Sequence, residues 1–136
     1  MNSRITDKIE EIEKYLKELK SIVPKEIKDY EEDIKVKAAC ERYFDKIMEA
    51  ATDLAFLIIK HENFPAPEDD LAVFIALFEK EIIGKELAYK LKEAKQMRNF
   101  IAHRYGFIDD LTVFNSITKE LFSDIEHFLQ AIKNLK

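Results

Sequence analysis

Residues 36–58, VKAACERYFDKIMEAATDLAFLI, decide the fold class of this chain. Their apolar side chains recur every three or four residues, which is the period of an α-helix that buries one side. The stripe consists of Val36, Cys40, Tyr43, Phe44, Ile47, Ala51, Leu54 and Ile58. No part of the sequence alternates with period two for long enough to form a strand, so the core is predicted to be helical.

Similar stripes predict helices on both sides of this stretch. Ser3 is a suitable N-cap for the first helix. Gly84 is expected to be a C-cap or a turn after the third helix, and Gly106 is expected to end the fourth. The second helical region is long for a globular protein, so we expect a bend or a break near residues 29–33. The predicted helical regions cover about 3–23, 26–61, 68–80, 85–103 and 109–136. Together they predict one all-α domain over residues 1–136, an up-down bundle of four to five helices.

Composition and charge limit the function classes. The chain has 136 residues, 47% of them hydrophobic, and a net charge of −5, which argues against a general nucleic-acid binder. Residues 80–104 nevertheless hold seven Lys and Arg against three Glu. This excess is typical of a solvated helix face, but it also fits a local groove for a polyanion. With one cysteine, no signal-peptide core and no apolar run of membrane length, we expect a cytoplasmic protein that does not bind a membrane.

One charge breaks the apolar pattern. In residues 98–106, RNFIAHRYG, Arg98 falls on the side of its predicted helix that also carries Leu91 and Ile101. A guanidinium on an apolar stripe needs a partner or an opening to solvent. Carboxylates recur every four residues earlier in the chain and favour a solvated helix face, although one of them could pair with Arg98. They are Glu41, Asp45, Glu49 and Asp53.

The same stretch carries the chemistry that the rest of the chain lacks. Asn99 and His103 are four residues apart and can hydrogen-bond, which would fix the imidazole tautomer. Arg98 lies about 140° around the helix from His103. A structural interpretation is equally available, because basic residues in the last turn interact well with the helix dipole. No phosphate loop and no metal-ligand spacing is present, so neither a metal site nor a cofactor is expected.

The pattern Arg98-Asn99-x-x-x-His103 resembles the motif of the HEPN superfamily. Its longer form, Arg98-x4-His103-x-Tyr105, is similar to that of the HepT toxins of the HepT/MntA type. Further features fall where that family has them: Glu41-Arg42, Asp53, Pro65 and Pro67, Ile82-Ile83-Gly84, and Val113-Phe114.

The resemblance implies a metal-independent endoribonuclease that cuts RNA as a homodimer, with two copies of the motif facing each other. Arg98 and His103 would be catalytic and Asn99 would support them. It also implies an MNT-type nucleotidyltransferase antitoxin, MntA, that transfers AMP to Tyr105. Candidates for the apolar dimer seam are Phe56, Leu57 and Phe100.

Two other interpretations remain open at this point. One is a non-catalytic HEPN module that binds a partner nucleotidyltransferase. The other is a plain structural bundle in which the basic cluster only caps a helix and Tyr105 is a packing aromatic.

Overall fold

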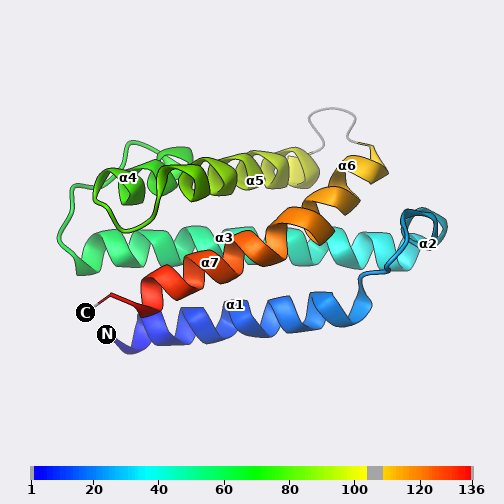
Figure 1. The fold of residues 1–136 in the computed structure, drawn as a ribbon, viewed down its shortest axis with the longest axis horizontal. Coiled ribbons are helices and arrows are strands. Elements are labelled where there is room, and N and C mark those ends of the chain that lie inside the picture. The colour runs from blue at the N-terminus through cyan, green and yellow to red at the C-terminus, as the bar shows by residue number, and fades with distance from the viewer. Residues whose placement is uncertain (1, 104–108, 136) are drawn as a thin grey trace.

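The longest helix, α3 (Ile34–His61), runs through the molecule, and α1, α2, α4 and α5 pack against it (Figure 1). The computed structural model describes residues 2–103 and 109–135, without the side chains of residues 102 and 103. This described part is helical and contains no strand, so the all-α prediction is confirmed. The other elements are α1 (Ser3–Ile22), α2 (Ile27–Glu32), the 3₁₀ turn η1 (Asp70–Ala72), α4 (Val73–Glu79), α5 (Lys85–His103), α6 (Asp110–Asn115), the π-helical η2 (Ser116–Leu121) and α7 (Phe122–Lys133).

Side-chain caps fix where the helices begin. The Oδ1 of Asp33 accepts from the backbone N–H groups of Lys35 and Val36, at 3.0 and 3.2 Å, which starts α3 and separates it from α2. The expected break near residues 29–33 is therefore confirmed. The prediction that Ser3 caps α1 is wrong, because the side chain of Asn2 accepts from the N–H of Ile5 at 2.9 Å and Ser3 is the first helical residue.

Gly84 does not end a helix. The left-handed residue after α4 is Glu81, with φ of 62°, and the next N–H, that of Ile82, donates to the carbonyl of Leu77 at 2.9 Å. This is the usual closing arrangement of a helix, and it is completed at Ile82, two residues before Gly84. The carbonyl of Gly84 instead accepts from Ala88 in the first turn of α5. The predicted third helix also begins later than expected, as the η1 turn.

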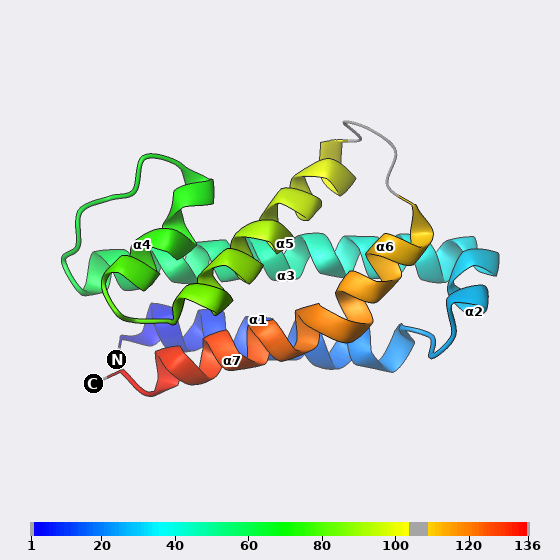
Figure 2. The ribbon, with the colours of Figure 1, turned by 45° about the horizontal axis from the view of Figure 1, so that its top comes forward.

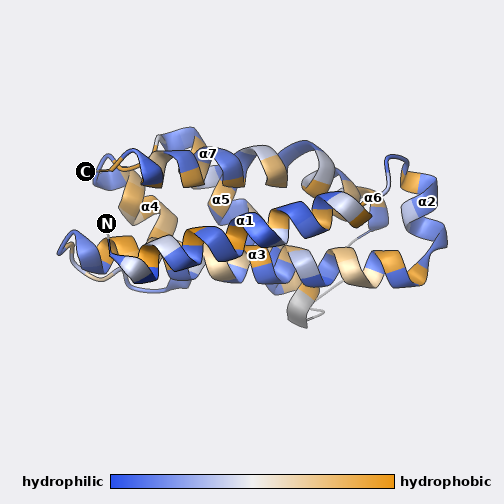
Figure 3. Ribbon diagram, turned by 90° about the horizontal axis from the view of Figure 1, so that it is seen from below, coloured by the Kyte–Doolittle hydropathy of each residue, from blue (hydrophilic) through white to orange (hydrophobic). Residues whose placement is uncertain are grey.

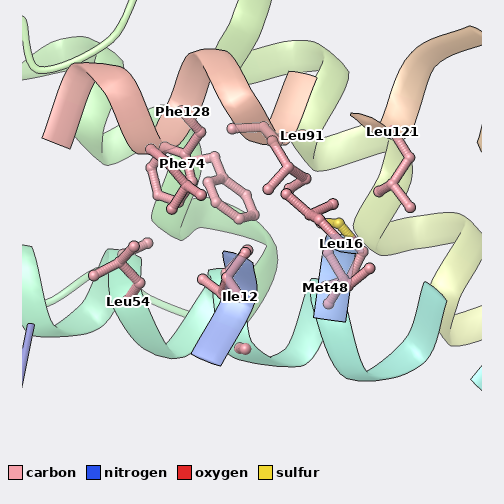
Figure 4. Close-up of a cluster of buried hydrophobic side chains, with 14 of the residues drawn as sticks. Ile12, Leu16, Met48, Leu54, Phe74, Leu91, Leu121 and Phe128 are labelled. Atoms are coloured by element: carbon pink, nitrogen blue, oxygen red, sulfur yellow. The ribbon is translucent and has the colours of Figure 1, made fainter. Parts of the chain in front are cut away.

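The core lies between α3 and the helices that cover it. Figure 4 shows side chains that meet there from five different helices, α1, α3, α4, α5 and α7, together with Leu121 of η2. Phe74 of α4 and Phe128 of α7 meet edge to face, with ring centroids 5.7 Å apart, a contact worth about 0.5–1.5 kcal/mol beyond burial. In Figure 3, α4 is hydrophobic over most of its length and lies among the other helices. None of the described helices is long and apolar enough to span a membrane.

The C-terminal helical region differs from the single helix predicted. Asp109 caps it as expected, accepting from the N–H of Thr112 at 2.8 Å. Between α6 and α7, however, the turns widen into η2, so the three elements form one rod with a π-helical middle (Figure 2). The rod packs on α5, and Lys133 near its end pairs with Glu13 of α1 at 2.7 Å. The stripe of Ile117, Leu121 and Ile125, spaced by four and four, remains buried along the widened turns.

Candidate functional site

Arg98, in the C-terminal half of α5, is held by two carboxylates of α3. Its Nε donates to Oδ1 of Asp45 at 2.5 Å, and its Nη2 donates to Oε2 of Glu49 at 3.4 Å. The side chains of Arg98 and Asp45 are 20% and 15% exposed, so this pair is partly buried. The alternative that an acid of α3 pairs with Arg98 is thus confirmed, and the interpretation of these acids as a solvated face is wrong for Asp45.

Asp45 serves two guanidinium groups. Its second oxygen, Oδ2, accepts from Nη1 of Arg42 at 2.8 Å, while Oδ1 is bound to Arg98. One carboxylate therefore faces two permanent cations, and Glu49 supplies a second negative charge from a side chain that is 60% exposed. The net charge of this group of four is zero, but an incoming anion could displace the exposed Glu49 at little cost.

Asn99 turns its amide oxygen toward Arg98. The Oδ1 of Asn99 accepts from Nη1 of Arg98 at 3.1 Å. The hydrogen bonds among the described residues therefore use three of the five N–H groups of Arg98. His103 is the last residue of α5. Its side chain, the predicted Asn99–His103 hydrogen bond and Tyr105 all lie outside the described part of the chain.

Lys95, one turn before Arg98, is buried, and the sequence analysis did not predict this. Its side chain is 6% exposed, and the nearest carboxylate oxygen, Oδ2 of Asp70, lies 4.0 Å from Nζ. Burial lowers the pKa of Lys95, and the like charge of Arg98 lowers it further, while Asp70 opposes both effects. A signal was present in the sequence, since Lys95 lies four residues after the buried Leu91.

Three of the described cations in the basic excess over residues 80–104 are buried or paired. Lys95 is buried, Arg98 is paired with α3, and Lys90 pairs with Glu86 at 3.2 Å. The interpretation of this excess as a groove for a polyanion stays a prediction. Asp53, which follows Glu49 by four residues on α3, does not pair with the described residues of α5. Its Oδ2 lies 3.7 Å from Nζ of Lys8 on α1.

Comparison with known proteins identifies the family. The model of a family described as "Ribonuclease HepT-like" matches residues 12–132. A protein of Archaeoglobus fulgidus with the provisional name RNase is 28% identical over 126 residues, which cover 90% of this chain and 93% of that protein. A protein of Aphanizomenon flos-aquae named tRNA nuclease HepT is 28% identical over 114 residues, 84% of this chain and 78% of that protein.

A solved structure shares the fold over almost the whole length. It is the tri-AMPylated HEPN toxin of Shewanella oneidensis in complex with an MNT antitoxin. The TM-score is 0.92 at 22% sequence identity, and the match covers 99% of this chain and 100% of that one. At this identity the likeness concerns the fold.

Proposed function

This chain belongs to the ribonuclease HepT-like family, and from that we propose that it is an endoribonuclease toxin whose cleavage site contains Arg98 and His103. One observation carries the proposal. Arg98 is anchored by Asp45 and Glu49 of α3, five residues before His103, the last residue of α5. The anchor leaves N–H groups on a guanidinium that is 20% exposed. The names of the two relatives, RNase and tRNA nuclease HepT, support RNA as the substrate.

The proposed reaction needs no metal, because RNA carries its own nucleophile, the 2′-OH. A histidine has an ordinary pKa of about 6.5, so His103 can accept the 2′-OH proton or protonate the leaving 5′ oxygen near neutral pH. Arg98 would bind the non-bridging phosphate oxygens and stabilise the charge that grows in the transition state. The products are then a 2′,3′-cyclic phosphate and a 5′-OH.

Asp45 acts on this chemistry through Arg98. It holds the guanidinium by Nε, so the Nη groups are the ones that a phosphate would meet. Glu49, which binds Nη2 at 3.4 Å from an exposed position, is the contact that the phosphate would replace. In this proposal Asp45 is a positioning residue and Glu49 is a displaceable one.

One chain supplies a single Arg98 and a single His103, whereas a base and an acid are both needed. We therefore place the complete site between two copies of the chain related by a two-fold axis. Phe100, on α5 between the two motif residues, is 44% exposed and is a candidate for the apolar seam.

The proposed control of the toxin is AMP transfer to Tyr105 by an MNT-type nucleotidyltransferase antitoxin. The phenolic oxygen attacks the α-phosphorus of ATP, pyrophosphate leaves and the phenolic proton is lost. The new phosphodiester carries a negative charge two residues from His103, where it would compete with the RNA phosphate for the same groups. The AMPylated toxin of Shewanella oneidensis, bound to its MNT antitoxin, supports this proposal by its fold.

Cleavage of RNA by the purified protein in excess EDTA tests the nuclease. Arg98→Ala and His103→Ala should each lower the rate by about 10²-fold or more, the usual contribution of such groups. Arg4→Ala and His61→Ala change the same residue types at exposed positions and should leave the rate unchanged. Activity that disappears in EDTA and returns with Mg²⁺ would overturn the metal-independent mechanism.

Mass spectrometry tests the AMP transfer. After incubation with ATP and a cognate nucleotidyltransferase, the adduct should be on Tyr105 and absent from Tyr105→Phe. Tyr89→Phe, at a 45% exposed tyrosine of α5, is the control. An adduct that persists in Tyr105→Phe would contradict the assignment.

The intrachain pairing of Arg98 favours a second candidate. A guanidinium already bound by Asp45 and Glu49 is also what a non-catalytic module that docks on a nucleotidyltransferase would contain. Under that function, His103→Ala leaves RNA levels and cell toxicity unchanged while the partner still binds.

A further inference from the structure

A cleft between α5 and the C-terminal rod carries a buried carboxylate that the nuclease proposal does not use. It is lined by residues of α5 and of the rod of α6, η2 and α7, together with Phe44 of α3, and its volume is about 260 Å³. Asp124, in the first turn of α7, lines it and is only 7% exposed.

The Asp124 carboxylate lacks a partner among the residues that the structure describes. Among residues 2–103 and 109–135 no group makes a hydrogen bond or an ion pair with it, and its oxygen atoms are not sealed from solvent. Lys90 and His127 act on it only from longer range, and Nζ of Lys90 is engaged by Glu86. Burial raises the pKa of Asp124, which is the electrostatic cost of a carboxylate without a partner.

The rest of the lining has one sign of charge and an apolar floor. Glu93 of α5 and Glu120 of η2 add two more carboxylates, and none of the described lining residues is basic. Phe44, Met97 and Leu121 supply hydrophobic surface beside them. Among the described residues, no group of three or more acids, histidines or cysteines is arranged to hold a metal ion. The matching ligand is therefore an organic cation with a hydrocarbon body.

We infer that this cleft binds an alkylammonium group, with the ammonium on Asp124 and the chain against Phe44, Met97 and Leu121. The cleft is slightly smaller than the usual ligand site of about 300–1,000 Å³, so the ligand is small. A protonated amine supplies both the charge and the donors that Asp124 lacks, and it remains cationic at neutral pH. The site lies between α5 and the rod of α6, η2 and α7. It does not depend on whether the chain cleaves RNA.

Titration of the full-length protein with n-hexylammonium, followed by calorimetry and by the methyl signals of Met97 and Leu121, tests the site. We expect saturable binding, weakened about tenfold or more in Asp124→Asn and for n-hexanol on the wild type, because each removes a charge-assisted hydrogen bond. Glu126→Gln, exposed on the outer side of α7, should bind as the wild type does.

Three results would overturn the inference: no saturable binding of n-hexylammonium, equal affinity for n-hexanol, or signal changes away from the cleft. If Asp124→Asn does not fold, Glu120→Gln at the exposed rim gives the same comparison, with binding weaker than in Glu126→Gln. A lysine side chain of another protein has the same chemistry as a free amine. Titration with Nα-acetyl-lysine methylamide compares the two sources, and tighter binding of either one identifies the source.

Discussion

Asp45 of α3 and Arg98 of α5 are 53 residues apart in sequence and form an ion pair, in which Nε of Arg98 lies 2.5 Å from Oδ1 of Asp45. This pair explains why a permanent charge can stand on the apolar side of α5, since the carboxylate that neutralises it comes from the neighbouring helix. The same contact fixes the position of the guanidinium relative to the central helix. Stability and the proposed activity should therefore respond together when Asp45 is changed.

Asp45→Asn should lower both the free energy of unfolding and RNA cleavage. We expect a stability loss of about 1–2 kcal/mol, because a partly buried charged hydrogen bond is weakened while Glu49 still binds Arg98. Glu49→Gln, at a side chain that is 60% exposed, should cost less than about 0.5 kcal/mol. Urea unfolding and kcat/KM for RNA measure the two effects. A larger loss for Glu49→Gln than for Asp45→Asn would contradict the ranking.

Lys95→Met should fold with unchanged or higher stability at neutral pH, by up to about 1 kcal/mol, because it removes a buried charge and keeps the packed stem. The pKa of Lys95 is lowered by burial, so the unfolded chain binds more protons than the folded chain between the lowered pKa and the usual value of 10.5. Wild-type stability should therefore rise relative to Lys95→Met as the pH increases toward 10.5. Thermal unfolding of both proteins across this range measures the difference.

Lys95→Ala is the matched comparison, since it removes the charge and the stem together and should be less stable than Lys95→Met. A loss of more than about 2 kcal/mol in Lys95→Met would mean that the acids around Lys95 depend on its charge.

Periodicity accounts for what the sequence could and could not predict. The stripe of α3 is regular over many turns, so the burial of most of it, including Cys40, followed from spacing alone, whereas Val36 and Tyr43 are only partly buried. The partner of Arg98 did not follow, because spacing along one helix does not tell which face of another helix lies opposite. The π-helical turns of η2 were missed for a related reason, since spacings of four and four fit an α-helix within its tolerance.

The site was predicted as residue types and only partly as an arrangement. The contact of Asn99 with Arg98, through Oδ1 and Nη1, was not predicted, and the predicted contact with His103 lies outside the described residues. The sequence does not indicate a cleft at Asp124. Its position three residues after Leu121 predicts only that it lies on the buried side of the rod, because a lone acid on an apolar stripe does not reveal a cleft. The roles of His103 and Tyr105 stay predictions that the experiments above address.

The single thiol should be nearly inert in the folded protein. Burial, and then the charge of Glu41, raise the pKa of Cys40 to about 11, so the thiolate fraction at pH 8 is on the order of one in a thousand. Reaction with a disulfide reagent at pH 8 should be slow under native conditions and complete after denaturation. Rapid native labelling would show that α3 opens locally around Cys40.

Tyr30→Phe should not destabilise the protein. The ring of Tyr30 is buried against Phe114, with centroids 5.4 Å apart, and its hydroxyl has no hydrogen-bond partner within the described residues. Removing an unpaired hydroxyl relieves a desolvation cost, so a gain of up to about 1 kcal/mol is expected. Tyr30→Leu, which loses the aromatic contact as well, should be clearly less stable. A loss in Tyr30→Phe would indicate that the hydroxyl is bonded.

Asn99 has two possible roles in the proposed cleavage. It could orient His103, or it could hold Arg98 in a position that leaves it available to the phosphate, and substitutions at Asn99 distinguish the two. Its Oδ1 accepts from Nη1 of Arg98 at 3.1 Å, so Asn99→Asp would place a full negative charge on a group that the phosphate must bind. Stability should be equal or slightly higher, because a partly exposed ion pair is worth less than about 1 kcal/mol. RNA cleavage should fall by about tenfold or more through competition for Arg98.

Asn99→Ala removes the side chain without adding charge and makes the comparison decisive. If Asn99 serves Arg98, Asn99→Asp should be the slower of the two, and its loss should shrink as salt screens the added charge. If Asn99 serves only to orient His103, Asn99→Ala should be the more damaging change, because a carboxylate can still accept from an imidazole N–H. Values of kcat/KM for both variants at low and high salt, with unfolding curves to confirm equal folding, distinguish these outcomes.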